Sequence, residues 1–484
     1  MQPGLPKRRR YGNGFVVGIP VLEKLIGSIP GGSLIVVLGH PGAGKTTFAS
    51  KLVYENIRVL GHKAVYISFA ETKDKYLEQM KRLGMDFEPL MNAGKFRFIH
   101  LPTIAGRECL DEIVSMMTNF ISEGYRIFVI DSITPLLKLL NETQARALLH
   151  GTLYSLINTT GSLLIAIADL PWGEESVELG GLEFVADGVL LFKAKLENGL
   201  LVRTMEIRKF RGCAIPLAEI PFTIVEGLGL RFYPYVPPEE IPPLDPHNLI
   251  STGCKLLDDA WGRIPKGASI SILYPVGVNI PSTILGVVAK FVTSNNFRLG
   301  IVSFEVSGDA LLAAIKMTAS MYGIDADRID KLVVMKRSFN PTSYSSYELV
   351  GNLISSIETS NPDILILHGL LPLLRVYGSE SSIRMLYNLW LFLKANGITC
   401  IKLTESVIRM ARNTPIVEPI ELAMFSDVVH IVIPITEGYT ANLYHVVLKS
   451  TPRFVSGLRD RDKPLFIPDE RLAHVCLGEY IAPT

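Results

Sequence analysis

The chain has 484 residues, enough for two or three domains that each bury a core of their own. Hydrophobic residues make up 48% of it, but no apolar stretch reaches the roughly 18 residues that a membrane-spanning helix needs. The 48 lysines and arginines nearly balance the 47 aspartates and glutamates. This balance excludes a protein that binds nucleic acid through its overall charge.

Five scattered cysteines without a CxxC pair predict neither a disulfide framework nor a zinc site, and they favour a reducing, cytoplasmic location. The basic run Lys7–Arg10 precedes an apolar stretch that is too short and too interrupted for a signal peptide, so we interpret it as a solvated tail. Only three glutamines occur in the chain, which points to a thermophilic source.

In the first half of the chain, short apolar runs alternate with longer helical patterns. The runs predict strands that are buried on both faces, at Leu34–Leu38, Ala64–Phe69, Phe96–Leu101, Ile127–Ile130 and Leu163–Ala168. Apolar residues at three- and four-residue spacing predict helices at Lys45–Leu60, Lys73–Leu83, Arg107–Glu123 and Thr143–Asn158. Alternation of this kind predicts an α/β fold with a mostly parallel, doubly wound sheet.

Beyond Asp187 the pattern changes. Two further strands, Val189–Ala194 and Leu201–Lys209, flank the turn residues Glu197, Asn198 and Gly199. An Asn-Gly pair between two apolar runs is typical of a β-hairpin. The sheet is therefore predicted to end in an antiparallel extension.

The second half of the chain repeats the first. Gly18–Gly32 aligns without gaps on Gly253–Gly267, an offset of 235 residues, and Ile127–Leu137 matches Ile364–Leu374. Five prolines within residues 237–247 predict a stiff, extended linker between the copies. We therefore expect one domain at 12–236, a Pro-rich linker at 237–247 and a second domain at 248–484, whose strands include Ile270–Leu273, Leu299–Phe304 and Ile364–Leu367.

A phosphate-binding loop is predicted between the first strand and the first long helix. Residues 39–46 read Gly-His-Pro-Gly-Ala-Gly-Lys-Thr and fit the Walker A pattern GxxxxGK[ST]. Its glycines allow backbone N–H groups to surround an anion, the lysine supplies a cation, and the threonine hydroxyl is a ligand for Mg²⁺. The expected nucleotide-binding residues are Gly39, Pro41, Gly42, Ala43, Gly44, Lys45, Thr46 and Thr47.

Two acidic residues are candidates for the chemistry of this loop. Asp131 closes a predicted central strand, where we expect it to reach the metal as the Walker B carboxylate; the alternative is that it caps the next helix. Ser132 is equally suited to that cap. Glu71 follows a neighbouring strand and is a candidate to activate water, or else an acidic residue that a helix N-terminus attracts.

Several segments together resemble the KaiC-like branch of the RecA/RadA ATPases. These are the Ile29-Pro-Gly-Gly-Ser33 lead-in, the Walker A loop, Ile67–Thr72, Phe184–Gly188 and Lys209–Gly212. The resemblance covers nearly the whole chain as two tandem RecA-like copies, and is specific for the first and degenerate for the second. It implies that ATP lies between the subunits of a hexameric ring, where Lys209 and Arg211 of one subunit reach the γ-phosphate of the next. Without it, both residues read as solvated charges on an edge strand.

The sequence departs from that family at several sites. The family usually carries two acids after the phenylalanine of the second strand, whereas here Ala70 precedes Glu71, so slow turnover is expected. In the second copy, Ile280 or Pro281 aligns with the lysine and His368 with Asp131. The position that is phosphorylated in the cyanobacterial clock protein of this family aligns with Ala423–Met424. We therefore expect neither autokinase activity nor a clock role.

The sequence favours a Mg²⁺-dependent, ATP-hydrolysing regulatory ring protein that is active in its first domain only. The second domain is then a pseudo-ATPase suited to ring assembly or to docking an unknown protein partner. Two alternatives stay open: a RadA-like DNA-binding accessory of recombination or repair, and a nucleotide-gated scaffold with little turnover. Nucleic acid is not favoured as a partner, because no concentrated basic and aromatic loop is evident.

Overall fold

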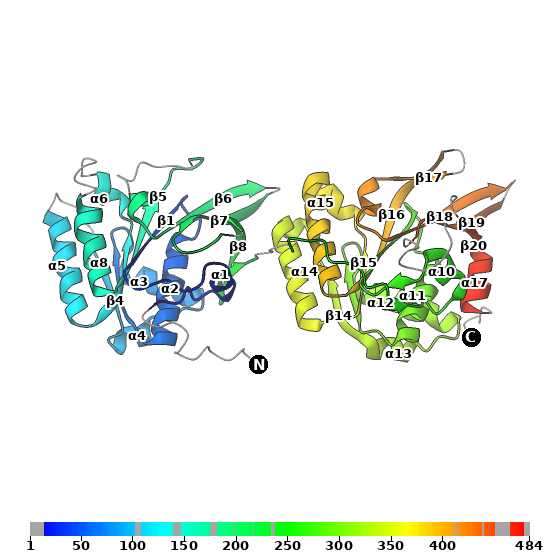
Figure 1. Cartoon of the computed structure of the whole chain (residues 1–484), viewed down its shortest axis with the longest axis horizontal. Helices are drawn as coiled ribbons and strands as arrows, with labels where there is room; N and C mark the ends of the chain where they lie inside the picture. Colours follow the sequence, from blue (N-terminus) through cyan, green and yellow to red (C-terminus); the bar gives the residue numbers. More distant parts are fainter. Residues whose placement is uncertain are drawn as a thin grey trace. The chain divides into compact units, whose positions relative to one another are not determined.

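The computed structural model of the chain describes residues 14–101, 108–138, 147–174, 182–197, 199–215, 217–233, 238–411, 414–437, 440–450 and 465–478. The chain divides into two compact units, Met1–Val236 and Pro237–Thr484 (Figure 1). Residues 238–247, in the predicted linker, form no helix or strand. The predicted basic tail at 7–10, the turn residue Asn198 and the start of the predicted helix at 143–146 lie outside the described residues.

A twisted sheet forms the centre of the first unit, with the strand order β3-β2-β4-β5-β1-β6-β7-β8-β9. All pairs from β3 to β6 are parallel, and the pairs from β6 to β9 are antiparallel. The strands are β1 (Ser33–Gly39), β2 (Lys63–Ser68), β3 (Phe96–His100), β4 (Tyr125–Asp131), β5 (Leu163–Asp169), β6 (Gly188–Glu197), β7 (Leu200–Phe210), β8 (Glu219–Val225) and β9 (Gly229–Phe232).

Helices cover both faces of this sheet, as the predicted doubly wound fold requires. They are α1 (Pro20–Ile26), α2 (Lys45–Leu60), α3 (Lys73–Arg82), α4 (Glu88–Asn92), α5 (Glu108–Ser122), α6 (Thr134–Lys138), the π-helical η2 (Ala147–Tyr154), α8 (Ser155–Thr160) and α9 (Leu182–Val185). Strand β1 is buried throughout, so its side chains point alternately into the two cores on either face of the sheet. Ile35 and Val37 pack toward α2, whereas Leu34 and Val36 share a core with residues of α5 and α8.

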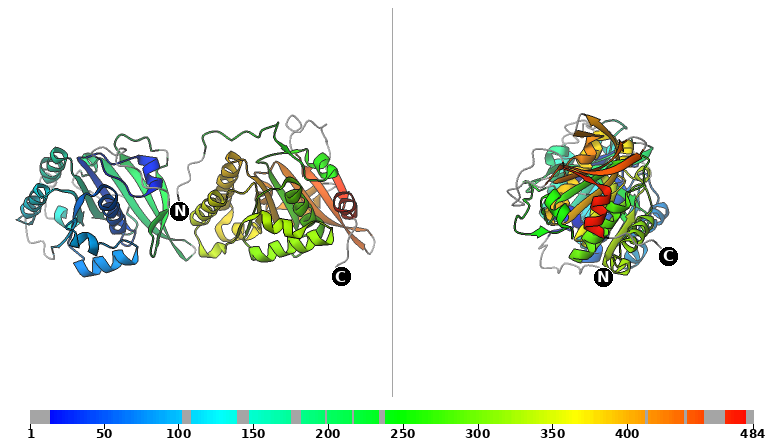
Figure 2. Two further views of the ribbon diagram at one scale, coloured as in Figure 1. Left: turned by 90° about the horizontal axis from the view of Figure 1, so that it is seen from below. Right: turned by 90° about the vertical axis from the view of Figure 1, so that its right-hand side faces the viewer.

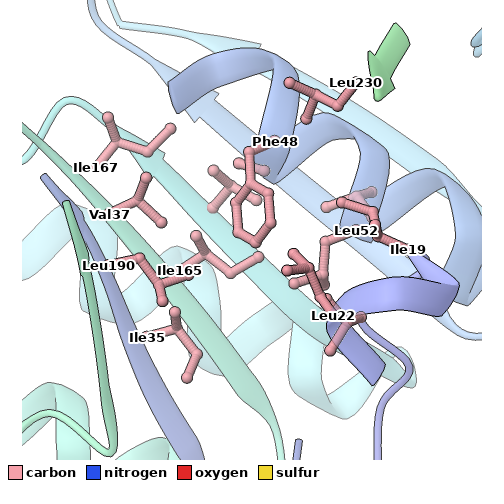
Figure 3. Close-up of a cluster of buried hydrophobic side chains, with 14 of the residues drawn as sticks. Ile19, Leu22, Ile35, Val37, Phe48, Leu52, Ile165, Ile167, Leu190 and Leu230 are labelled. Carbon is pink, nitrogen blue, oxygen red and sulfur yellow. The ribbon is translucent and has the colours of Figure 1, made fainter. Parts of the chain in front are cut away.

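Apolar side chains line the core between α2 and the sheet (Figure 3). Phe48 and Leu52 of α2 belong to one buried cluster with Val37 of β1 and Leu190 of β6. The Phe48 ring also packs on Phe192, with ring centroids 5.1 Å apart. Burial of these side chains holds α2, and with it the predicted phosphate-binding loop, at the end of the central strand.

The second unit repeats this topology, with the strand order β14-β13-β15-β16-β12-β18-β19-β20 and with β17 beside β16. Its strands are β12 (Ser269–Pro275), β13 (Leu299–Ser303), β14 (Val333–Ser338), β15 (Ile364–His368), β16 (Thr399–Ala411), β17 (Thr414–Glu418), β18 (Val428–Glu437), β19 (Thr440–Lys449) and β20 (Leu465–Pro468), and a separate small pair is formed by β10 (Leu249–Ile250) and β11 (Ile264–Pro265).

Helices again lie on both sides of the second sheet (Figures 1 and 2). They are α10 (Lys255–Trp261), α11 (Ser282–Asn295), α12 (Gly308–Met321), α13 (Ala326–Leu332), η3 (Pro341–Ser343), α14 (Ser346–Ser360), α15 (Leu371–Ala395), η4 (Ile420–Ala423) and α17 (Asp469–Leu477). Two mostly parallel sheets with antiparallel extensions confirm the predicted fold class. None of the helices described has the length and apolar character that crossing a membrane requires.

The repeat can be followed residue by residue. Helices α2 and α11 end at Leu60 and Asn295, which are 235 residues apart, like Gly18 and Gly253. Strand β6 pairs with β1, and β18 with β12, in matching registers: Val37 lies beside Leu190, and Ile272 beside His430. Positions in the two cores can therefore be compared directly.

This comparison reveals a buried polar chain, the histidine relay, in the core of the second unit. Trp261 Nε1 lies 2.9 Å from His430 Nδ1, and His430 Nε2 lies 2.9 Å from His445 Nδ1. His445 Nε2 lies 2.7 Å from Asp469 Oδ1, which also accepts a hydrogen bond of 2.6 Å from the Thr283 hydroxyl. In the first unit the five corresponding positions are the buried apolar residues Ile26, Leu190, Met205, Phe222 and Phe48.

A disulfide bond joins Cys254 to Cys476, 222 residues later in the chain. The expectation of no disulfide was therefore wrong. Neither cysteine belongs to a local motif, and only the packing of α17 beside α10 brings them together. The Lys290 ammonium donates to the Cys476 carbonyl. Helix α17 is thus attached at its start through Asp469 and at its end through Cys476.

Candidate active site

The loop between β1 and α2 has the geometry that its glycines predict. Gly39 has φ 151°, and a Cβ added there would lie 2.0 Å from the Phe192 carbonyl oxygen. Gly44, which precedes α2, has φ 101°. Only glycine fits such positions without strain. The loop therefore runs close against β6 and delivers the positive end of a sixteen-residue helix to the carboxyl edge of the sheet.

Lys45 is buried at the first turn of α2, and its ammonium group turns back onto the loop. It donates to the carbonyl oxygens of Gly39 and His40, at 2.7 and 2.9 Å. A third contact, of 3.1 Å, joins it to the carboxylate of Asp169 at the end of β5. The position of Asp169 follows from the strand register, in which it lies beside Gly39.

Asp131 ends β4, and its carboxylate contacts the side chain of Thr46 on α2. Its Oδ2 accepts hydrogen bonds from the Thr46 hydroxyl, at 2.8 Å, and from the Tyr66 hydroxyl of β2, at 2.6 Å. Burial raises the pKa of Asp131 above its usual range, and these two hydrogen bonds oppose the rise. The Ser132 hydroxyl accepts from the Thr134 amide at the start of α6, 3.3 Å away. The capping contact at this helix thus falls to Ser132.

Glu71 lies just after β2, two residues before α3 begins at Lys73. Its amide donates to the Ser68 hydroxyl at 3.0 Å. The carboxyl oxygen Oε2 is buried, and within the described part of the chain no group hydrogen-bonds to it. Burial raises the pKa of Glu71, and the nearby negative charge of Asp131 raises it further.

The arrangement fits a magnesium ion held together with substrate phosphates. Among the described residues, no group of three His, Cys, Asp or Glu side chains could hold a metal by itself. Magnesium at a phosphate-binding loop needs only one or two protein ligands, since phosphates and water supply the others. Thr46 and Asp131 offer one hydroxyl and one carboxylate 2.8 Å apart. Burial raises the pKa of Asp131, and a cation bound beside it would stabilise its carboxylate.

Lys209 and Arg211 lie far from this loop within their own unit. The Lys209 ammonium donates to the Phe184 carbonyl at 3.0 Å, and the Arg211 guanidinium pairs with Asp187 at 3.0 Å. Lys209 lies in the end of β7 that pairs with the start of β6, and Arg211 follows directly after β7 ends at Phe210. The start of β6 lies beside Ile35, four residues before the loop begins at Gly39.

The corresponding site of the second unit has a different chemistry. His368 replaces Asp131, and its ring nitrogens lie 3.0 Å from the Ser303 hydroxyl and 3.3 Å from the Tyr274 hydroxyl. Burial lowers the pKa of His368 to about 4, so the ring is neutral near pH 7. Helix α11 begins at Ser282 after Pro281, and Ile280 packs against the core where the first unit has Lys45.

Sequence reasoning missed three side chains of the first site. Asp169 is the last residue of an apolar strand, as Asp131 is, and this position in the sequence could have identified it as a candidate. Tyr66 lies inside a buried strand, where nothing in the sequence separates it from core aromatic residues. The ring of Trp172 stacks on His40 of the loop with centroids 5.4 Å apart.

Comparison with known proteins finds similarity to one ATPase family. Residues 16–236 match the family described as "ATPase: KaiC". The chain is 28% identical over 330 residues to the circadian clock protein KaiC3 of Synechocystis sp., covering 65% of this chain and 63% of that protein. It is 25% identical over 345 residues to the circadian clock oscillator protein KaiC of Picosynechococcus sp., covering 67% and 65%. These alignments span less than two thirds of the length of either relative.

Proposed function

We propose that the first unit, whose residues 16–236 match the KaiC ATPase family, binds ATP with Mg²⁺ and hydrolyses it. The observation that carries this proposal is the contact of 2.8 Å between Thr46 and Asp131 beside the buried Lys45. The hydroxyl, carboxylate and ammonium groups that a bound triphosphate and its Mg²⁺ require are thus close together.

Each group has a distinct role in this proposal. Lys45 and the backbone amides of the loop hold the phosphates, while Thr46 and Asp131 hold Mg²⁺, which would offset charge on the β- and γ-phosphates. Glu71 orients the attacking water and accepts its proton. Among the described residues Oε2 of Glu71 has no hydrogen-bond partner, and this supports the role, because that oxygen can accept a hydrogen bond from water. Glu71 acts without a second acid, since Ala70 precedes it, and turnover is accordingly slow.

We further propose that Lys209 and Arg211 complete the site of a neighbouring copy in a homo-oligomeric ring, a hexamer by analogy with the family. Two observations support this. Arg211 is exposed and Lys209 is partly buried, and both lie toward the opposite end of β1 from the loop of their own unit. Residues so placed serve a nucleotide only across a subunit boundary.

In the same proposal the second unit binds no triphosphate and acts in assembly or partner docking. Ile280 removes the cation, the neutral His368 removes the metal ligand, and Pro281 removes one backbone N–H. Its core is nevertheless as completely buried as that of the first unit. The fold is therefore expected to persist without nucleotide.

Phosphate release and particle mass, measured on the full chain, test this proposal. With Mg²⁺ and ATP we expect phosphate release, a mass several times that of one chain, and one tightly bound nucleotide per chain. Lys45→Ala removes charge-assisted contacts worth about 1.5–3 kcal/mol each and should lower binding or turnover at least tenfold. Lys24→Ala, at an exposed position of α1, is the control. Unchanged affinity and turnover in Lys45→Ala would contradict the proposal.

A further inference from the structure

We propose that Asp169 is the counter-ion that Lys45 exchanges for the phosphates of ATP, and that this exchange sets the affinity of the first unit for nucleotide. The inference rests on the proposed function, because it takes the Walker A loop as the triphosphate site. It adds one residue to that site: a carboxylate whose place beside Lys45 the phosphates of the substrate would take.

The first step concerns the hydrogen-bonding capacity of Lys45. An ammonium group has three N–H donors and no acceptor. In this structure it has three acceptors within 3.1 Å: the carbonyl oxygens of Gly39 and His40, and a carboxylate oxygen of Asp169. The cation is therefore saturated, and a phosphate oxygen can bind it only when one of these acceptors leaves.

The second step identifies the acceptor that leaves. The two carbonyl oxygens belong to the loop backbone, which is fixed against β6: a Cβ on Gly39 would lie 2.0 Å from the Phe192 carbonyl oxygen, and the His40 amide donates to that same oxygen at 3.1 Å. The side chain of Asp169 is 52% exposed, against 8% for Lys45. Water can hydrate the departing carboxylate, so Asp169 is the exchangeable partner.

The third step is electrostatic. A carboxylate on Lys45 occupies the position where anionic phosphate oxygens must approach, and its charge also acts on Asp131, whose pKa it raises. Nucleotide binding must break the ion pair between Lys45 and Asp169, and it must also displace the negative charge of Asp169, which repels the phosphates. Both requirements oppose binding. An uncharged side chain of the same shape therefore lowers the free-energy cost of binding.

The test is the affinity of the full chain for ATP with Mg²⁺, measured by calorimetry for wild type and Asp169→Asn. Because the ion pair is half exposed, we expect binding to tighten roughly three- to tenfold. Asp169→Glu retains the charge and should stay closer to wild type than Asp169→Asn does. Asp111→Asn changes the net charge equally at an exposed position of α5, and should bind like wild type.

Each result has a distinct meaning. Tighter binding in Asp169→Asn alone supports the exchange. Unchanged or weaker binding in Asp169→Asn, with a wild type that binds ATP, overturns the inference and leaves the proposed function intact. If wild type binds no ATP under these conditions, the proposed function itself fails. Unfolding of each variant by urea without nucleotide shows whether a change in affinity follows from a change in fold.

Discussion

Mild acid is expected to destabilise the second unit through its histidine relay. With both rings neutral, Trp261 donates to His430, His430 donates to His445, and His445 donates to Asp469. Each of the four ring nitrogens then either donates or accepts one hydrogen bond. A second proton on the His430 ring makes its Nδ1–H face the Trp261 Nε1–H, because Trp261 can only donate. Burial and the neighbouring His445 ring lower the pKa of His430 well below its ordinary value.

The sign and size of the effect follow from that depressed pKa. The unfolded chain binds a proton at His430 below about pH 6.5 whereas the folded unit does not, so stability rises with pH in this range. One proton is worth about 1.4 kcal/mol per pH unit, so acidification from pH 6.5 to 5 removes about 2 kcal/mol from the free energy of unfolding. His368, with a pKa lowered to about 4, adds an effect of the same sign.

The assay is urea unfolding of the full chain at pH 7.5 and pH 5, followed by the fluorescence of Trp261. Replacing Trp172 and Trp390 by phenylalanine leaves Trp261 as the sole tryptophan. This ring is buried within the relay, so its signal reports the second unit. A decrease of more than about 2 kcal/mol at the lower pH is expected for this reference protein, because His430 and His368 contribute with the same sign.

A double variant isolates the relay from other titrating groups. His430→Leu with His445→Met introduces the residues that the first unit has at these positions, and it removes His430, the ring whose pKa burial lowers. Its stability at pH 7.5 should fall by about 2–5 kcal/mol, because Trp261 and Asp469 lose buried partners. Its loss between pH 7.5 and 5 should be smaller than that of the reference. His474→Gln, at an exposed site on α17, should keep the full dependence. An equal pH dependence in the double variant and the reference would refute this reasoning.

Three further predictions concern single contacts. Tyr66→Phe removes the 2.6 Å hydrogen bond to Asp131, so the pKa of Asp131 should rise further and turnover should require several-fold more Mg²⁺, as a magnesium titration would show. Arg211→Ala should lower turnover in the assembled protein with little change in ATP affinity; full turnover by a monomeric wild type would contradict this. Cys254→Ser removes the disulfide to Cys476 and should lower the stability of the second unit by about 2–5 kcal/mol in urea unfolding, an effect that reductant should reproduce in wild type.

Much of the fold could be predicted because buried parallel strands are continuous apolar runs. The run Leu34–Leu38 lies within β1, and the predicted helix Lys45–Leu60 coincides with α2. The edge of the sheet was harder to predict. Strand β8 contains Pro221 and alternates poorly, and α17 is a short helix that depends on contacts with α10 and α11.

The candidate site likewise contains some residues that the sequence predicts and others that it does not. Lys45 and Thr46 are neighbours in the sequence, and the Walker A pattern predicts that the lysine binds phosphate and the threonine binds Mg²⁺. Asp169 and Tyr66 reach the site only through strand register, which places Asp169 beside Gly39 and aligns Ser68, two residues after Tyr66, with Asp131. Register depends on packing between segments that lie 60 to 130 residues apart in the sequence. A single sequence constrains it only through the apolar pattern of each strand.

The histidine relay could not be predicted from any one of its residues. A histidine alone at the Leu190 position, or an aspartate alone at the Phe222 position, would leave buried polar atoms without partners and would cost about 1–3 kcal/mol for each such atom. The five residues are compatible with the core only as a set, in which each donor meets one acceptor. That set links α10, β18 and β19 to the first turns of α11 and α17. The second unit lacks the lysine and carboxylate of the first site, and in the same region it has gained polar contacts that attach its last helix. Its core thus stabilises a docked α17, which is consistent with the proposed role in assembly or partner docking.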